Sequence, residues 1–139
     1  MTDKDYILCE CELSPLEQFI ASLEKDFEIK MAGGPAVCLT MIKAEDSVEG
    51  QPFYLGEALT TECEVLVNGI PGLGLCMGDE PVRSYCIAFL DALEQLDGPH
   101  TGRVDAFLQD QARLISEART LEYNHILRTR VDFKLMEQE

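Results

Sequence analysis

Residues 68–81, NGIPGLGLCMGDEP, place four glycines within ten positions and end where a helix is expected to begin. Asn68-Gly69 is typical of a type I′ hairpin turn, because both residues tolerate a positive φ. Leu73, Leu75 and Met77 then alternate with glycines and a cysteine. This alternation predicts a strand with one bulky face and one nearly bare face. A bare face allows a helix or another backbone to come close.

A glycine-rich loop before a helix raises the question of phosphate binding, since free N–H groups and the helix dipole favour an anion there. Here Asp79 is the predicted N-cap, and Glu80 and Pro81 lie in the first turn. The two carboxylates would repel a phosphate. The stretch also lacks the lysine of a P-loop. We therefore interpret it as a turn, a strand and a helix cap.

Two helices are expected before this stretch. Thr2 and Asp5 resemble a capping box for a short helix at roughly 3–12. In SPLEQFIASLEKDF, Ser14 is the predicted N-cap and Pro15 suits the first helical position. Apolar residues recur there at helical spacing, which predicts a helix at about 15–26.

The middle and end of the chain predict strands and a long helix. Residues 36–44 are β-branched and apolar, and residues 27–32 are the expected hairpin partner across a turn at 33–35. Residues 53–67 hold one or two strands, a helix is expected at roughly 103–127, and 130–136 alternate as a terminal strand. We expect a single α+β domain over residues 1–139. Its antiparallel sheet would have about four to five strands with helices packed on it, a long C-terminal helix and a short terminal strand.

Composition and charge narrow the function classes. The chain is 46% hydrophobic and 27% charged, as in ordinary globular domains, and carries a formal net charge of −15. This charge argues against binding nucleic acid or anionic membranes and favours a partner with basic surfaces. Met1 to Asp5 are polar, with no apolar signal segment behind them, so we expect a cytoplasmic protein.

The six cysteines are expected to be core thiols. Cys9 and Cys11 form C-x-C, which is not the C-x-x-C of zinc or redox sites. The other four lie among apolar residues, where free cysteine behaves as a small hydrophobe. We expect no metal site. A cysteine-based metal or thiol protein is the alternative, and stoichiometric zinc or iron in the purified chain would indicate it.

No catalytic constellation emerges from the residues. His100 is expected in a loop and His125 late in a helix, and neither has a nucleophile or acid placed with it. Five of the six arginines, all except Arg83, lie in the last part of the chain. That region is the best candidate for meeting an anion or an acidic partner; the alternative is a solvated helix that carries mixed charges.

Two stretches carry a family resemblance. Residues 56–96 contain G-[ED]-A-x-x-T, an alternating strand, a turn, glycines at 72 and 78, and a helix with Asp91-Ala92-Leu93. Residues 128–136 contain Arg130-Val131-Asp132-Phe133. In this order the chain resembles the PhnG subunit family of the bacterial carbon–phosphorus lyase system, and length and element order match over nearly the whole chain.

The resemblance implies a function within a complex. Members of that family act with partner subunits to transfer a phosphonate to C1 of the ribose of ATP. Adenine is displaced, and the product is a ribose 1-phosphonate 5-triphosphate. The radical iron–sulfur chemistry that later cleaves this product belongs to another chain, so no cofactor is expected here. The small subunit is implied to be needed for transfer without a catalytic residue of its own.

Site residues follow as hypotheses. If this chain meets the anionic substrate, we expect contact through Arg83, Arg128 or Arg130. If it contacts only partner subunits, we expect Arg130, Val131, Asp132 and Phe133, with Arg130 and Asp132 as the paired polar side. The alternative function is a stand-alone small acidic binding or assembly protein that forms a homodimer through the long helix.

Overall fold

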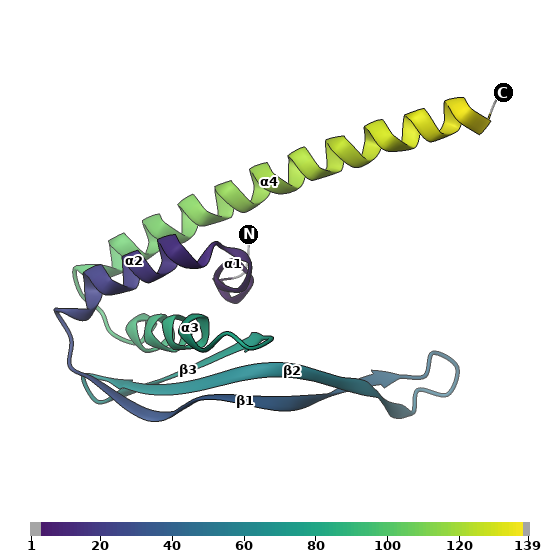
Figure 1. Cartoon of the computed structure of the whole chain (residues 1–139). Helices are drawn as coiled ribbons and strands as arrows, with labels where there is room; N and C mark the ends of the chain where they lie inside the picture. Colours follow the sequence, from purple (N-terminus) through teal and green to yellow (C-terminus); the bar gives the residue numbers. More distant parts are fainter. Residues whose placement is uncertain (1–3, 138–139) are drawn as a thin grey trace.

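A computed structural model describes residues 4–137 of the chain, with side chains described as far as Thr129. The elements follow in the order α1 (Lys4–Glu10), α2 (Leu13–Glu24), β1 (Ile29–Glu45), β2 (Pro52–Val67), β3 (Ile70–Met77), α3 (Pro81–Glu94) and α4 (His100–Glu137). The strands form one antiparallel sheet in the order β1-β2-β3. Helix α3 lies on one face of the sheet, and α1, α2 and the first part of α4 form a further layer over α3 (Figure 1). The α+β class and the antiparallel sheet are confirmed.

The sheet has three strands within the described residues, fewer than the four to five expected. The turn predicted at Gly33-Gly34-Pro35 is wrong, because β1 runs through it and pairs with β2 on both sides. The glycines instead make an irregularity in the strand pairing, where Gly34 has a φ of 77°. The chain reverses direction later, in the loop at residues 46–51. Residues 29–31 therefore pair with 65–67, not with 36–44.

The terminal strand predicted at 130–136 is also wrong. The backbone of α4 continues as helix to Glu137, which makes an element of 38 residues, or about 57 Å at 1.5 Å per residue. The alternation of Val131 and Phe133 with Arg130 and Asp132 indicated a strand locally. Adding residues to an existing helix is easier than starting a new element, so the helix that precedes this segment continues through it.

The glycines of the opening stretch set the distance between α3 and the sheet. Asn68 and Gly69 have φ of 51° and 83°, which confirms the predicted hairpin turn. In β3 the side facing α3 is formed by Gly72, Gly74 and Cys76, all buried. A Cβ atom at Gly72 would lie 2.1 Å from the Ala88 carbonyl oxygen. The bare face expected from the sequence therefore brings α3 directly against β3.

The start of α3 is capped differently from the prediction. Glu80, not Asp79, is the N-cap, and its side chain makes no capping hydrogen bond. The buried Thr61 of β2 supplies the cap: its Oγ1 accepts from the Glu80 N–H at 3.0 Å and donates to the Gly78 carbonyl at 2.6 Å. Similarly, the N-cap of α2 is Glu12, and Ser14 is the second residue of that helix. The capping residue predicted at Thr2 lies outside the described residues.

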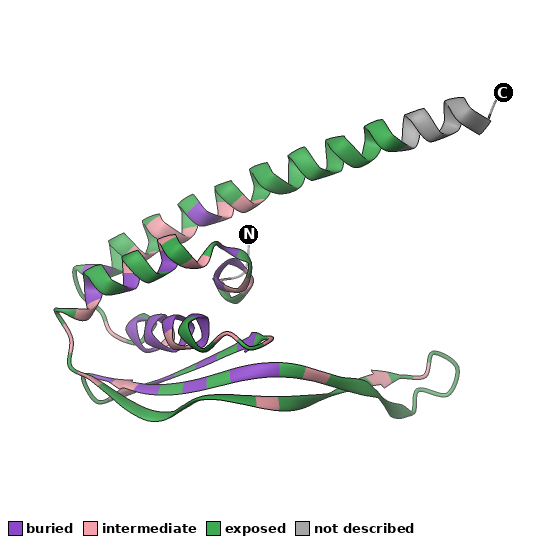
Figure 2. Ribbon diagram, viewed as in Figure 1, coloured by how far each residue is buried: buried purple, intermediate pink, exposed green. Residues whose placement is uncertain are grey.

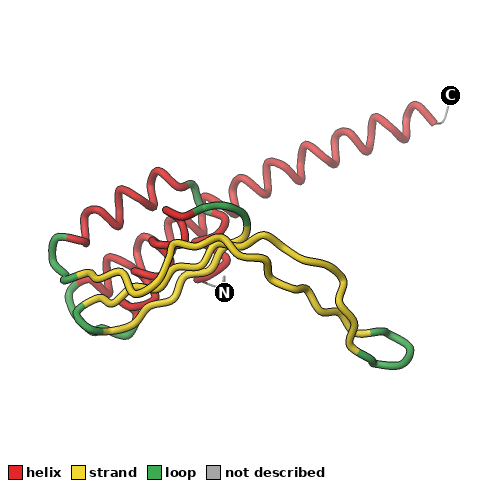
Figure 3. The backbone as a smooth tube through the Cα atoms, turned by 60° about the horizontal axis from the view of Figure 1, so that its bottom comes forward, coloured by secondary structure: helices red, strands yellow, loops and turns green. Residues whose placement is uncertain are grey.

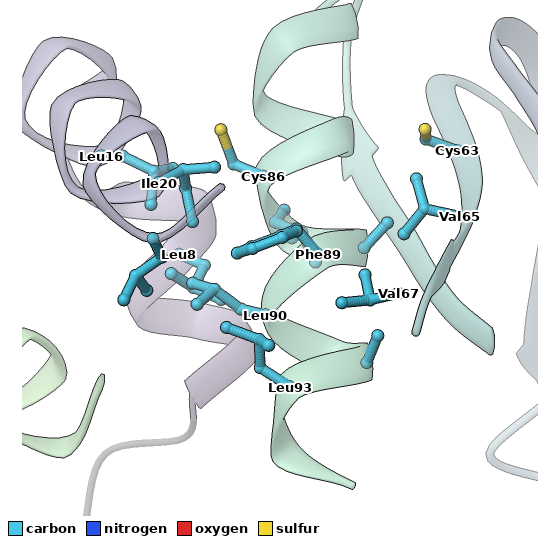
Figure 4. Close-up of a cluster of buried hydrophobic side chains, with 14 of the residues drawn as sticks. Leu8, Leu16, Ile20, Cys63, Val65, Val67, Cys86, Phe89, Leu90 and Leu93 are labelled. Carbon is cyan, nitrogen blue, oxygen red and sulfur yellow. The ribbon is translucent and has the colours of Figure 1, made fainter. Parts of the chain in front are cut away.

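Helix α3 is the centre of the hydrophobic core. It is buried on the sheet side and on the side of α1 and α2, because both layers pack on it. Figure 4 shows this cluster, with Leu8, Leu16 and Ile20 on one side of Phe89 and the β2 side chains Val65 and Val67 on the other. Stacking of Phe19 on Phe107, with ring centroids 4.2 Å apart, joins α2 to α4.

Candidate functional site

The predicted site residues do not form one site. Arg83 lies in α3 within the core, whereas Arg128 lies on the exposed part of α4 that extends away from the other helices (Figure 1). The side chains of Arg130, Val131, Asp132 and Phe133 lie outside the described residues.

Arg83 holds two helices together. Only 7% of the residue is exposed. Its Nη1 donates to the carbonyl oxygens of Leu8 and Cys11 at 2.8 and 2.7 Å, and its Nε donates to Glu80 at 3.2 Å. The guanidinium thus satisfies carbonyl groups at the C-terminal end of α1, where a cation is favoured by the helix dipole. This geometry gives Arg83 a structural role, and substrate contact by Arg83 remains a prediction.

The two histidines lie in different parts of helix α4. His100 is the first residue of α4 and is buried, not in a loop as expected. Its Nε2 donates to the carbonyl oxygen of Leu96 at 2.8 Å, just beyond the end of α3. His125 is exposed on the extending part of α4. Neither ring is placed beside a nucleophile or acid among the contacts of the described residues.

Burial raises the pKa of the four buried thiols. All six cysteines are free, and four of them, Cys11, Cys63, Cys76 and Cys86, are buried, while Cys9 and Cys38 are half-buried. Burial, followed by the nearby Glu80, raises the pKa of Cys76 to about 11. Burial, together with Glu17 and Glu24, raises the pKa of Cys86 to about 12. A neutral thiol is a poor nucleophile and a poor metal ligand, so these groups act as core side chains.

A cleft of about 580 Å³ lies between α1, α3 and α4. Its walls are mainly apolar, from residues such as Leu90, Val104 and Leu108. Its charged residues are Lys4, Glu94 and Asp105, and the Lys4 ammonium is ion-paired with Glu94. Because carboxylates outnumber ammonium groups there, the cleft is unsuited to an anion such as a phosphonate.

The most distinctive surface features are two extensions with exposed apolar side chains. The first, which we call the arm, comprises residues 39–59: the ends of β1 and β2 that continue beyond β3, with the loop that joins them. The last residue of β3, Met77, pairs with Thr60, so the arm is a two-stranded ribbon (Figure 3). Its exposed large apolar residues are Leu39, Met41, Ile42, Val48, Phe53, Tyr54, Leu55 and Leu59.

The second extension is the distal part of α4. All residues from 116 to 129 are exposed (Figure 2). They include Leu121, Tyr123 and Ile126, which are 72%, 62% and 55% exposed. Although α4 is long, neither it nor any other helix within residues 4–137 has an apolar stretch that could span a membrane. Apolar patches of this kind on a polar chain are typical of protein–protein interfaces.

Sequence reasoning pointed to the distal part of α4 but missed the arm. The arm residues were expected as strands, and nothing in their alternation shows that β3 stops short of them. The available signal was length: residues 53–67 are almost twice as long as the strand that follows the Asn68-Gly69 turn. When a long strand pairs with a short one, the end of the long strand has no neighbouring strand on that side.

Comparison with known proteins identifies the relatives of this chain. A family model described as "Phosphonate metabolism protein PhnG" matches residues 5–138. The chain is also similar to a protein of Rhizobium meliloti (strain 1021) named "Alpha-D-ribose 1-methylphosphonate 5-triphosphate synthase subunit PhnG". The two are 28% identical over 131 residues, which cover 94% of this chain and 83% of the relative.

Proposed function

Because this chain belongs to the PhnG family of phosphonate metabolism proteins, we propose that it is a subunit of a ribose 1-methylphosphonate 5-triphosphate synthase. The observation that carries the proposal is the family match over residues 5–138, which includes every helix and strand of the domain except the first residue of α1. The name of the Rhizobium meliloti relative, which describes a subunit of that synthase, supports the proposal.

In the proposed reaction, a phosphonate is attached to C1 of the ribose of ATP while the bond from C1 to adenine breaks. The product is a ribose 1-phosphonate 5-triphosphate. We assign this chain a supporting role in the complex, with the reacting groups on partner subunits. The buried thiols and the cleft between α1, α3 and α4 support this division of roles, because neither offers an acid–base pair or a net positive charge that would bind an anion.

We further propose that the distal part of α4 meets these partners or the substrate. Arg128 and Arg130 are the candidates for substrate contact, and Arg130, Val131, Asp132 and Phe133 are the candidates for partner contact. Their position at the end of a helix that leaves its own domain supports this assignment. Residues 116–129 carry two arginines and two glutamates, so this part of α4 is neutral whereas the whole chain is strongly acidic.

The test is a native pull-down of the tagged chain from its own cells, grown with a phosphonate as sole phosphorus source. We expect larger subunits of the synthase to co-purify in a fixed ratio. Arg130→Ala should reduce this ratio or the phosphonate turnover of the complex. Arg113→Ala is the matched control, because Arg113 is an exposed arginine of α4 that already pairs with Asp110 and Glu117. A chain that purifies alone, as a monomer or homodimer, would contradict the proposal.

A further inference from the structure

Helix α3 covers one face of the sheet. The same face of β1 and β2 continues along the arm, where none of the described helices covers it. Paired residues of neighbouring strands lie on the same face of a sheet, and residues two apart along a strand share a face. Thr61 and Cys63 lie under α3 and are buried. Leu59 belongs to the same face as they do, and so does its partner Leu39. Leu59 and Leu39 are 44% and 62% exposed.

The two faces of the arm differ in a way that indicates burial of this one. On the α3 side, β1 places Leu39 and Met41 in the arm and Val37 just before it, and all three are about half exposed or more. On the opposite side, β1 places Cys38, Thr40 and Ile42, of which only Ile42 is a large apolar residue, and the Thr40 hydroxyl is hydrogen-bonded to Thr60. When one face of a strand is more apolar than the other, the more apolar face is normally the buried one.

Nothing within residues 4–137 covers the apolar face of the arm. Helix α3 begins at Pro81, beside the end of β3, and runs away from the arm (Figure 1). A ribbon of two strands is marginally stable in water without a layer packed on it. The arm therefore has the residue pattern of a core whose second layer is supplied from outside the chain.

The charged residues of the arm indicate which kind of partner would fit this face. Within the arm, Glu45, Asp46, Glu49 and Glu57 are opposed by Lys43 alone, which lies 5.5 Å from the ring centroid of Tyr54. A symmetric pairing of two copies would bring these carboxylates against one another. A partner with basic residues beside its apolar stripe would neutralise them.

From these observations, and resting on the function proposed above, we infer that the α3-side face of the arm binds an amphipathic helix of a partner subunit. The apolar stripe of that helix would cover Val37, Leu39, Met41 and Leu59, with lysines or arginines flanking it. A helix fits better than an added strand, because a strand would pair at the edge of the ribbon and leave this face exposed. The bound helix would extend the layer that α3 begins.

The test compares two lysine substitutions on the same strand in the full-length tagged chain. Leu39→Lys places a charge on the proposed interface, whereas Ile42→Lys replaces an exposed apolar residue of the opposite face. Both sites are exposed, so both variants should fold, and the melting temperature checks this. We expect Leu39→Lys to weaken binding of purified partner subunits by at least about tenfold and Ile42→Lys to leave it within about twofold.

A photo-crosslinking amino acid at position 39 then identifies the bound segment. The expected product joins position 39 to a helical segment of a partner subunit that carries lysine or arginine beside its apolar residues. A crosslink to a strand, to an acidic segment or to a second copy of this chain would overturn the inference. Equal binding by the two lysine variants would overturn it as well, while leaving assembly of the unchanged chain intact. Failure of the unchanged chain to bind any partner would instead overturn the proposed function and this inference together.

Discussion

Replacing Gly72 by alanine tests whether the glycines of β3 are present to bring α3 close. A Cβ at position 72 would lie 2.1 Å from the Ala88 carbonyl oxygen, about 1.3 Å short of the 3.4 Å at which ordinary contact begins. It would also lie 2.8 Å from the backbone nitrogen of Ala92. Backbone atoms cannot rotate away as a side chain can. Helix α3 also cannot retreat freely, because Leu90 and Phe89 are packed against the outer helical layer.

Overpacking a core by one methyl group destabilises proteins by roughly 1–3 kcal/mol, and the upper end applies when backbone must move. We therefore expect Gly72→Ala to lower the free energy of unfolding by about 3 kcal/mol, measured by urea denaturation. The corresponding fall in melting temperature is about 6–12 °C for a domain of this size.

Gly56→Ala is the matched control. Gly56 is also a strand residue, and a Cβ there would meet nothing within 4 Å. We expect its stability to stay within about 0.5 kcal/mol of the unchanged chain. Gly72→Ala with the same small effect, or an equal loss from both substitutions, would refute the close-approach argument.

Three further predictions concern the polar groups inside the fold. Thr61→Val removes both hydrogen bonds at the start of α3 and should cost about 2 kcal/mol in urea unfolding, while Thr61→Ser should restore most of the loss. Arg83→Met should cost about 3 kcal/mol and speed proteolysis between α1 and α2, whereas Arg128→Met should have no effect on stability. The folded-state pKa of Cys86 is raised from 9.0 to about 12, so its contribution to stability is present below pH 9 and is lost as the pH rises toward 12. Unfolding measured across this range should show a weaker pH dependence in Cys86→Ala; an unchanged slope would contradict the assignment.

The structure also explains several of the residues on which the family resemblance depends. Thr61 and Gly78 are joined by a hydrogen bond beside the start of α3. Gly72 faces Ala92 across the contact between β3 and α3. Asp91 accepts a hydrogen bond from the Leu73 N–H at 3.0 Å, which occupies a backbone donor of β3. These residues hold the fold together and need no catalytic explanation.

Patterns among residues close together in the sequence were enough to predict part of the fold. The hairpin at Asn68-Gly69, the bare face of β3, the helix near 15–26 and the core positions of Cys11, Cys63, Cys76 and Cys86 all depend on neighbouring residues or on period. Cys38, also expected in the core, is half-buried and lies outside the core cluster. The N-cap of α3 was misplaced because a backbone group at a helix start can be satisfied by a residue of another element, as Thr61 of β2 does for Glu80. No local pattern contains that partner.

What the sequence by itself determined is the class of the protein: an acidic α+β domain with a long C-terminal helix, whose ordered motifs resemble the PhnG family. The tertiary structure decided which residues are left for partners. In the structure Arg83 is buried between α1 and α3, and residues 130–133 are part of helix α4. Strand β3 ends before the arm begins. The physical reason is that burial depends on which elements lie opposite one another. The sequence pattern formed by Val37, Leu39 and Met41 is the same for a strand that a helix covers and for a strand that is left exposed.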